Sequence, residues 1–305
     1  MKQKIFNLIR KYVLIYLTGN LGIIKETDDK IICYVKKNVG KLDISGKTIA
    51  CFGIASENQE LANVYHINKP VCYVFEGIEF NKQHMYIFGY NNCEVIVKDC
   101  KFKYGLTIHV NGTCILDNNC IIPLHNGINI SADNLIIKNI NIDNKFKPAI
   151  LGKQNIMIGA TKDLDIIETN IGAINENLNI SIFSSDKMNV INSKIAGNVV
   201  KCGAIDFQIN ENSEIIASSM IDIKAKQFDK INIKSPKIFY NEQEIISEKE
   251  KITLRKIKSP LELKIKELID TLKIIKEECE RTNSEDIKTY KSSLNNKSIS
   301  RVLKK

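Results

Sequence analysis

Apolar and polar residues alternate with a period of two in many short segments in the middle of the chain. These segments are marked by isoleucines two positions apart: Ile128 and Ile130, Ile140 and Ile142, Ile180 and Ile182, Ile221 and Ile223, and Ile231 and Ile233. The alternation is typical of half-buried β-strands, and the Asn, Asp, Gly and Ser residues between the segments are typical of turns. No amphipathic helix separates the predicted strands, so a βαβ architecture is not expected.

A short phrase recurs along the same region. It reads "FEGIEF" from Phe75, "VKDCKF" from Val97, "DNNCII" from Asp117 and "IKNINI" from Ile137. In each copy a small or turn-forming residue precedes an apolar one, and this position is occupied by Gly77, Asp99, Asn119 and Asn139. Ile171, Ile195 and Met220 continue the pattern at longer steps. Short strands that repeat in this way predict a parallel β-solenoid with loops inserted on some coils.

Four cysteines follow one another at a constant stride of 21 residues: Cys51, Cys72, Cys93 and Cys114. Successive coils of a solenoid lie about 4.8 Å apart, so residues one coil apart lie over each other. We therefore expect an interior file of these four thiols that continues at Leu135, and a second file made of Cys100, Cys120 and Ile140. Zinc sites use converging ligands, commonly in CxxC pairs. The chain has no CxxC pair, and we expect neither a metal nor another cofactor.

The column of Asp99, Asn119 and Asn139 resembles the asparagine-ladder turn of right-handed parallel β-helix proteins, the pectate-lyase-like superfamily. The resemblance covers residues 30–246 and includes no catalytic motif. It implies that stacked side chains of this column hydrogen-bond along the file. The expected fold is all-β: a right-handed parallel β-helix of roughly 8–10 coils, with an N-terminal capping helix and a C-terminal helix.

Both ends of the chain have helical patterns. Near the N-terminus one helical face holds Ile5, Leu8, Ile9, Tyr12, Val13, Tyr16 and Leu17, which we expect to cover the first coil; a basic membrane-surface helix is the alternative. Near the C-terminus a heptad seam holds Leu261, Ile265, Leu268, Leu272, Ile275 and Cys279. It either folds back on the solenoid or joins copies of the chain into a homo-oligomer through residues 261–279.

These patterns divide the chain into four parts. Residues 1–25 form the cap helix, 26–246 the β-helix, and 247–280 a linker with the C-terminal amphipathic helix. Residues 281–305 form a basic tail whose polar composition predicts disorder.

The net charge of +9 resides at the two ends, because residues 1–20 and 281–305 are basic and the rest sums to zero. A nucleic-acid partner is not expected, since the body has no basic excess to neutralise phosphates. The nine cysteines form an odd number and lie mostly in apolar runs, which favours a reducing compartment. No convincing signal peptide or membrane-spanning segment is recognised. We expect a cytoplasmic protein, with peripheral membrane contact through its basic termini as the alternative.

Candidate catalytic groups are few. Asp117 and Glu168 are aligned in one column two coils apart, a separation that would suit an inverting glycosidase, but we expect both to be turn or solvent-face residues instead. Lys98 and Lys138 lie beside the predicted ladder, where a lyase would place its base. His109 and His125 fall in neighbouring coils and belong to no recognised motif.

Aromatic residues gather between residues 73 and 104, namely Tyr73, Tyr86, Phe88, Tyr90 and Tyr104. We expect Phe to fill the interior and Tyr to pack at turns; the alternative is that several of these rings point outward and form a strip that binds glycans.

The fold alone does not determine the function. We expect a non-catalytic β-helix scaffold or binding protein that presents an extended surface to a glycan or protein partner. A polysaccharide-active enzyme, either a lyase or a glycoside hydrolase, is one alternative, and a peripheral membrane protein is another. No catalytic residue is assigned.

Overall fold

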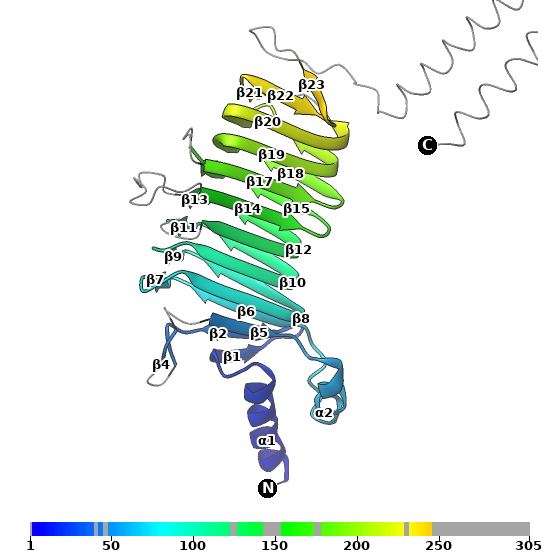
Figure 1. Ribbon diagram of the computed structural model, residues 1–305. Coiled ribbons are helices and arrows are strands. Elements are labelled where there is room, and N and C mark those ends of the chain that lie inside the picture. The colour runs from blue at the N-terminus through cyan, green and yellow to red at the C-terminus, as the bar shows by residue number, and fades with distance from the viewer. Residues whose placement is uncertain are drawn as a thin grey trace, which may run out of the picture. The chain divides into compact units, whose positions relative to one another are not determined.

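The computed structural model describes residues 2–39, 42–44, 48–122, 127–142, 154–173, 178–228 and 232–245. This part of the chain forms a right-handed β-solenoid of about 7 turns (Figure 1). The predicted fold class is therefore confirmed, with fewer turns in the described part than the predicted 8–10. The predicted C-terminal helix, the seam at 261–279 and the basic tail all lie outside the described residues.

The coils have three walls, each built from parallel strands. Wall A contains β5 (Thr48–Phe52), the first parts of β8 (Met85–Lys98), β10 (Leu106–Asp117) and β12 (Ile128–Lys138), then β14 (Gln154–Ala160), β17 (Leu178–Ser184), the middle of β19 (Lys194–Ile209) and of β20 (Glu214–Phe228), and β22 (Lys237–Tyr240). Wall B contains β2 (Ile31–Val35), β6 (Val71–Glu76), the second parts of β8, β10 and β12, then β15 (Leu164–Ile167), β18 (Lys187–Ile191) and the ends of β19 and β20. Wall C contains β7 (Glu79–Phe80), β9 (Lys101–Phe102), β11 (Cys120–Ile121), β13 (Asn141–Ile142), β16 (Asn170–Gly172), the starts of β19 and β20, and β21 (Asn232–Lys234).

Smaller elements lie at the ends and beside the walls. At the N-terminal end α1 (Lys2–Leu17) is followed by β1 (Gly22–Glu26), which pairs antiparallel with β2. At the other end of the solenoid β23 (Gln243–Ile245) pairs antiparallel with β22. The remaining elements are the strand pair β3 (Asn38–Val39) and β4 (Leu42–Asp43), the 3-10 helix η1 (Ser56–Asn58) and the helix α2 (Gln59–Val64).

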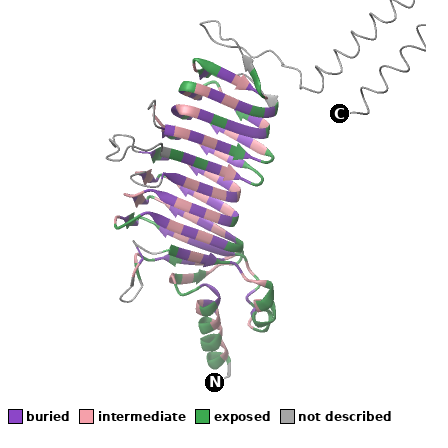
Figure 2. Cartoon of the chain, viewed as in Figure 1, coloured by how far each residue is buried: buried purple, intermediate pink, exposed green. Residues whose placement is uncertain are grey.

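The core is a stack of inward-facing side chains, because alternate residues of each strand point into the coil. Figure 2 shows this alternation of buried and more exposed positions along the strands. In wall B the strand pairings place one inward residue of each coil over the next: Cys33, Tyr73, Val95, Cys114, Leu135, Leu164, Met188 and Phe207. All of them are buried.

The turn from wall B to wall C has one residue with left-handed backbone (positive φ) in successive coils. Its column contains Gly77, Asp99, Asn118, Asn139, Glu168 and Asn192, all with φ between 48° and 65°. Gly and Asn adopt this backbone more readily than other residues. The predicted turn positions are therefore correct at Gly77, Asp99 and Asn139, but the third is Asn118 instead of Asn119.

Asn119 instead begins a buried polar column one residue further on. Its side-chain Oδ1 accepts a hydrogen bond from the backbone N–H of Cys100 at 2.8 Å, and its Nδ2 donates to the carbonyl of Val97 at 2.8 Å. Later coils use hydroxyls in the same way: the Thr169 N–H donates to Ser193 Oγ at 3.0 Å. We call Asn119, Thr169, Ser193 and Ser213 the polar ladder; all four residues are buried.

The equal spacing of cysteines does not produce one file of thiols. Cys114 lies over Leu135 as predicted, but Cys51 pairs with Gly89 and Cys72 pairs with Glu94. Cys72 alternates with the inward Tyr73, so its side chain belongs to the opposite surface of the strand. In the second predicted file, Cys120 pairs with Lys101 and Asn141, not with Cys100 and Ile140. The coils differ in length, so a constant stride does not keep a constant register.

Helix α1 forms as predicted, but it uses a different face to contact the solenoid. Leu14 and Leu17 in its last turn are buried in a small cluster with Ile31, Ala62 and Ile67. Most of the predicted covering face is exposed instead: Ile5, Leu8, Ile9, Tyr12 and Tyr16. The physical reason is an ion pair between Arg10 of the helix and Glu26 of β1.

Arg10 fixes the side from which α1 docks. Its guanidinium makes two contacts with the Glu26 carboxylate, at 2.6 and 2.7 Å, and its Nε donates to the Tyr65 carbonyl at 2.9 Å. The ring of Phe6 stacks on Tyr65 with 5.6 Å between centroids. These contacts turn the Phe6, Arg10 and Leu14 side of the helix inward.

This anchor predicts an acid-sensitive attachment of α1. The hydrogen bond from Arg10, with a further one from Lys69, holds the pKa of Glu26 below its usual range. The pKa of Glu26 is lower in the folded protein than in the unfolded chain. The ion pair therefore stabilises the docking of α1 at pH values above the ordinary pKa of glutamate, and this stabilisation is lost as the pH falls through the folded pKa. We expect hydrogen exchange of α1 amides, corrected for intrinsic rate, to accelerate below about pH 4. Glu26→Gln should lack this step, and an equal step in both proteins would contradict the prediction.

Candidate functional site

A group of aromatic rings lies on the outer surface of wall A near the N-terminal end. We call Phe52, Tyr86, Phe88, Tyr90 and His109 the aromatic strip. Phe52 and Tyr90 are stacked with 5.3 Å between centroids, and Phe88 lies 5.8 Å from His109 and 6.5 Å from Tyr90. Phe52 is 39% exposed and Tyr90 is 45% exposed, so these two rings are accessible from solvent.

Strand register brings the rings together from three coils. Ala50 of β5 pairs with Phe88 of β8, which pairs in turn with His109 of β10. Phe52 pairs with Tyr90. Because Ile87 and Met85 point inward and are fully buried, period-two alternation places Tyr86, Phe88 and Tyr90 on the outside.

The predicted aromatic set is thus divided by the structure. Tyr86, Phe88 and Tyr90 face outward, so the prediction that Phe fills the interior is wrong for Phe88, and Tyr86 and Tyr90 lie within a strand and not at a turn. Tyr73 is fully buried, and its hydroxyl donates to the Phe52 carbonyl at 2.8 Å. Tyr104 is half-buried in the turn after β9.

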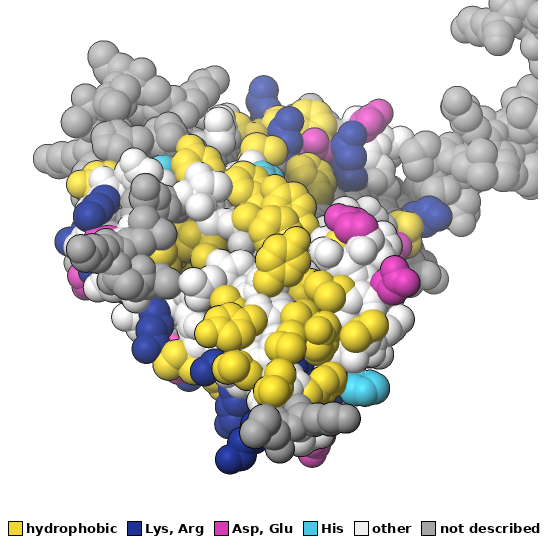
Figure 3. Space-filling model, turned by 90° about the horizontal axis from the view of Figure 1, so that it is seen from below, with side chains coloured by type: hydrophobic (Ala, Val, Ile, Leu, Met, Phe, Trp, Pro, Cys, Tyr) yellow, Lys and Arg dark blue, Asp and Glu magenta, His cyan; other side chains and the backbone are white. Residues whose placement is uncertain are grey.

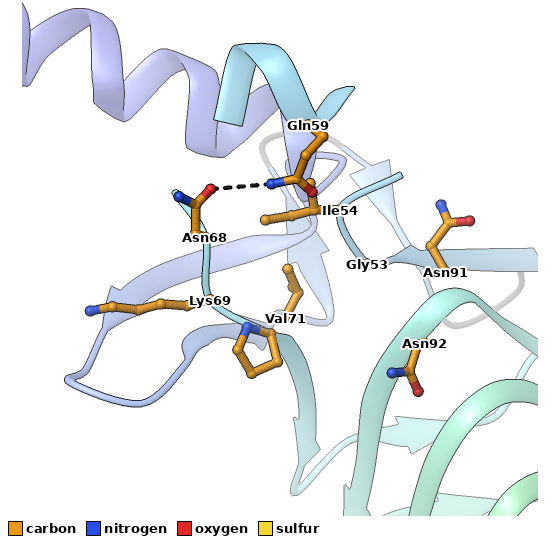
Figure 4. Close-up of a pocket in the computed structure, with 9 residues that line it drawn as sticks. Gly53, Ile54, Gln59, Asn68, Lys69, Val71, Asn91 and Asn92 are labelled. Carbon is orange, nitrogen blue, oxygen red and sulfur yellow. Dashed lines mark hydrogen bonds between the residues drawn. The ribbon is translucent and has the colours of Figure 1, made fainter. Parts of the chain in front are cut away.

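An amide-lined hollow adjoins the strip (Figure 4). It has a volume of about 270 Å³ and is lined by Gly53, Ile54, Gln59, Asn68, Lys69, Pro70, Val71, Asn91 and Asn92. Gly53 directly follows Phe52 and Asn91 directly follows Tyr90. The N–H of Gly53 donates to the carbonyl of Tyr90 at 2.8 Å, so the stacked rings and the hollow share one piece of backbone.

The polar groups of the hollow are mostly neutral amides. Gln59 Nε2 donates to Asn68 Oδ1 at 3.3 Å, and Asn91 and Asn92 both have left-handed backbone. The one cationic lining residue, Lys69, is held by Glu26, with 3.2 Å between Nζ and Oε1. Amides offer both donors and acceptors, so the hollow suits a ligand with many hydroxyl groups.

His109 of the strip and the neighbouring His84 are both held by hydrogen bonds. His84 is buried, with Nδ1 3.0 Å from the Tyr104 carbonyl and Nε2 2.8 Å from Thr107 Oγ1. Burial lowers the pKa of His84, which favours the neutral ring. His109 Nδ1 lies 2.5 Å from Ser131 Oγ. His125 lies outside the described residues, so its predicted approach to His109 stays a prediction.

The predicted carboxylate pair is wrong. Asp117 lies in register with Lys98 and Lys138, whereas Glu168 belongs to the left-handed turn column. The two acids therefore occupy different columns. Lys138 Nζ lies 3.1 Å from Asp117, and Lys98 Nζ lies 3.1 Å from Glu76. Both lysines are therefore held in surface ion pairs by carboxylates, whereas a lyase base has to be free to accept a proton.

Other acid chemistry has little support among the described residues. The pKa of Glu214 is lowered by a hydrogen bond from Lys234, as that of Glu26 is by Arg10, whereas a general acid needs a raised pKa. Within the described ranges, no group of His, Cys, Asp and Glu residues is arranged to hold a metal ion. None of the described helices has the length and apolar character needed to cross a bilayer.

No family model, curated protein or solved structure matches this chain. The aromatic strip and the amide-lined hollow are therefore the features that bear on function. Phe52 and the hollow were not predicted from the sequence, and His109 was named as a candidate histidine but not as a member of the aromatic group. The only sequence signal for the hollow is the Asn91–Asn92 pair after an aromatic residue, and it does not reveal that residues 53–70 close the other side.

Proposed function

We propose that this chain is a non-catalytic binding protein that holds a neutral glycan along the aromatic strip. The observation that carries the proposal is the continuity of solvent-accessible stacked rings with a hollow lined by amides. Sugar rings have apolar C–H faces that pack on aromatic rings, and hydroxyl groups that amides can bind as donor or acceptor. Ligand sites commonly combine an apolar body with a few placed polar groups in this way.

The preference for a neutral glycan rests on the residues around the strip. Outward positions in register with the rings are Thr48, Ala50, Thr107, Asn129 and Ser131. None is charged, and the Lys69 ammonium is already paired. A polyuronate would place its carboxylates here without cationic partners, which costs binding energy.

The ladder turn gives membership of the pectate-lyase-like superfamily some support, and that assignment stays a prediction. The alternative function is the cleavage of a polysaccharide by a lyase or glycoside hydrolase of this superfamily. The paired states of Asp117, Lys98 and Lys138 favour binding over cleavage.

The proposal predicts that Tyr90→Ala lowers glycan affinity at least tenfold, about 1.4 kcal/mol. The ring is the more exposed member of the strip's stacked pair, so its loss removes the most accessible stacking surface, directly before Asn91 of the hollow. Soluble β-1,4-glucan, β-1,4-mannan and polygalacturonate oligosaccharides are screened first by calorimetry, and affinities are then measured for the one that binds.

Phe183→Ala is the matched control. Phe183 is an exposed aromatic on the same outer surface, in β17, at 43% exposure, and it lies outside the strip. Its removal should leave affinity unchanged. Binding of polygalacturonate alone, an equal loss in both variants, or release of new sugar ends from the oligosaccharide would contradict the proposal.

A further inference from the structure

Helix α1 has an apolar face that the solenoid does not cover. We call Ile5, Leu8, Ile9, Tyr12 and Tyr16 the free face. All five are exposed, with Tyr12 at 64% and Tyr16 at 69%. On the opposite side the helix is held by Arg10, Leu14 and Leu17, as described above. The helix is already packed on the solenoid through its other side, so the free face is not needed to cover the first coil.

The free face is part of a larger apolar surface at this end of the solenoid. Ile23 of β1 and Val64 of α2 are also exposed, at 52% and 59%. Figure 3 shows hydrophobic side chains gathered over this end, with lysine and arginine side chains along one margin and acidic side chains along another. Scattered exposed hydrophobics need no explanation, but a gathered patch rimmed by charge is typical of an interaction surface.

The charge on α1 indicates the kind of partner. The helix contains no acidic residue. Lys4 and Lys11 lie four residues before and three residues after Leu8, which places both along one border of the free face. Both are exposed, and neither has a carboxylate within ion-pair distance among the described residues. Arg10, in contrast, is paired with Glu26.

We propose that the free face of α1 binds an anionic lipid surface, with the helix lying in the headgroup region. An interfacial helix needs an apolar face, a basic border and little net hydrophobicity, and α1 has all three. Tyr12 and Tyr16 have the amphipathic rings that favour the membrane interface. The Arg10–Glu26 anchor holds the helix on the solenoid, so binding would fix the whole solenoid to the surface.

A second copy of the chain fits the free face less well. Two α1 helices packed face to face would bring Lys4 and Lys11 close to the same residues of the other copy, with no acid on either helix to pair with them. Glu57 of η1 and Glu60 of α2 are exposed and would offer a second copy some counter-charge. The experiment therefore measures the mass of the protein as well as its binding.

The test uses the full chain and vesicles of phosphatidylcholine with and without phosphatidylserine, separated by sedimentation at low salt. We expect at least tenfold tighter binding to the phosphatidylserine vesicles, weakening as salt rises. Leu8→Ser with Ile9→Ser should reduce binding at least tenfold. Lys4→Gln with Lys11→Gln should reduce it by about 25-fold, roughly fivefold for each lysine near the surface. All four positions are exposed, so these variants should keep the native circular dichroism spectrum.

Ile205→Ser is the control, because Ile205 is an exposed isoleucine of β19 outside this patch; it should bind vesicles as the unchanged chain does. Three results would overturn the proposal. One is no binding to anionic vesicles; another is equal binding to both vesicles without salt dependence. The third is a dimer in light scattering that Leu8→Ser with Ile9→Ser converts to monomer, which would assign the free face to a second copy.

Discussion

Phe102→Ala is expected to lower the free energy of unfolding by about 3–5 kcal/mol. Phe102 of β9 is fully buried, and its ring stacks on that of Phe80 with 4.8 Å between centroids and 8° between planes. The pairings place Phe80 and Ile121 directly on either side of it in wall C. Removing the ring leaves a cavity that the neighbouring coils, held by their backbone hydrogen bonds, cannot fill. Urea unfolding followed by circular dichroism measures the loss.

Phe52→Ala is the matched comparison, since Phe52 is also stacked on a neighbouring ring but is partly in solvent. An exposed aromatic pair contributes only about 0.5–1.5 kcal/mol, so the loss should be much smaller. Equal losses in the two variants would mean that the interior of wall C is not packed as described.

Asn119→Leu is expected to destabilise the protein by about 3 kcal/mol. The substitution removes the acceptor for the Cys100 N–H and the donor to the Val97 carbonyl, and both backbone groups stay inside the coil. Each buried group left without a partner costs about 1–3 kcal/mol, whereas the added apolar atoms recover part of that. The same unfolding experiment measures this change.

Asn119→Thr provides the internal check. Thr169 occupies the equivalent place in a later coil, where its Oγ1 accepts from the Ile140 N–H at 3.3 Å and donates to the Ile167 carbonyl at 2.8 Å. Threonine at 119 should therefore restore the acceptor for the Cys100 N–H, and with it part of the lost stability, although it donates within its own coil and not to Val97. If the threonine variant is as unstable as the leucine variant, hydrogen bonding in the polar ladder is not what holds this turn.

The coil turns could be predicted because a left-handed backbone restricts residue type. Gly77, Asp99 and Asn139 were recognisable for this reason. The third turn was misplaced because Asn118 and Asn119 are identical in the sequence and differ only in which one turns the backbone. A shift of one residue exchanges the inner and outer surfaces of a strand, so the residue predicted at the exposed turn is buried.

The cysteine stride of 21 residues is close to the length of several coils but does not keep their register. In wall B the inward column runs from Tyr73 to Val95, Cys114, Leu135 and Leu164, and these intervals are unequal. Loops and bends absorb the differences, as at the register shift after Val110 of β10. Only backbone pairing determines which residues lie over each other, and composition carries no direct signal for it.

The site was predictable in its residue types and not in its geometry. Tyr86, Phe88 and Tyr90 could be named as an aromatic group, but their outward direction follows from the register of β8. The hollow depends on residues 53–70 returning beside Asn91, which no local pattern indicates. For α1 the amphipathic pattern was evident, yet the covered side is determined by the long-range contact between Arg10 and Glu26.

The cysteines of the solenoid make its integrity directly measurable. Every described cysteine except Cys120 is buried, and none of the described thiols is in a disulfide. Burial raises the pKa of Cys33 and Cys93 to about 11 and that of Cys202 to about 12, so at neutral pH the reactive thiolate is scarce as well as inaccessible. Alkylating reagents therefore reach these sulfurs only when a coil opens, and the order in which they are modified maps where the stack first comes apart.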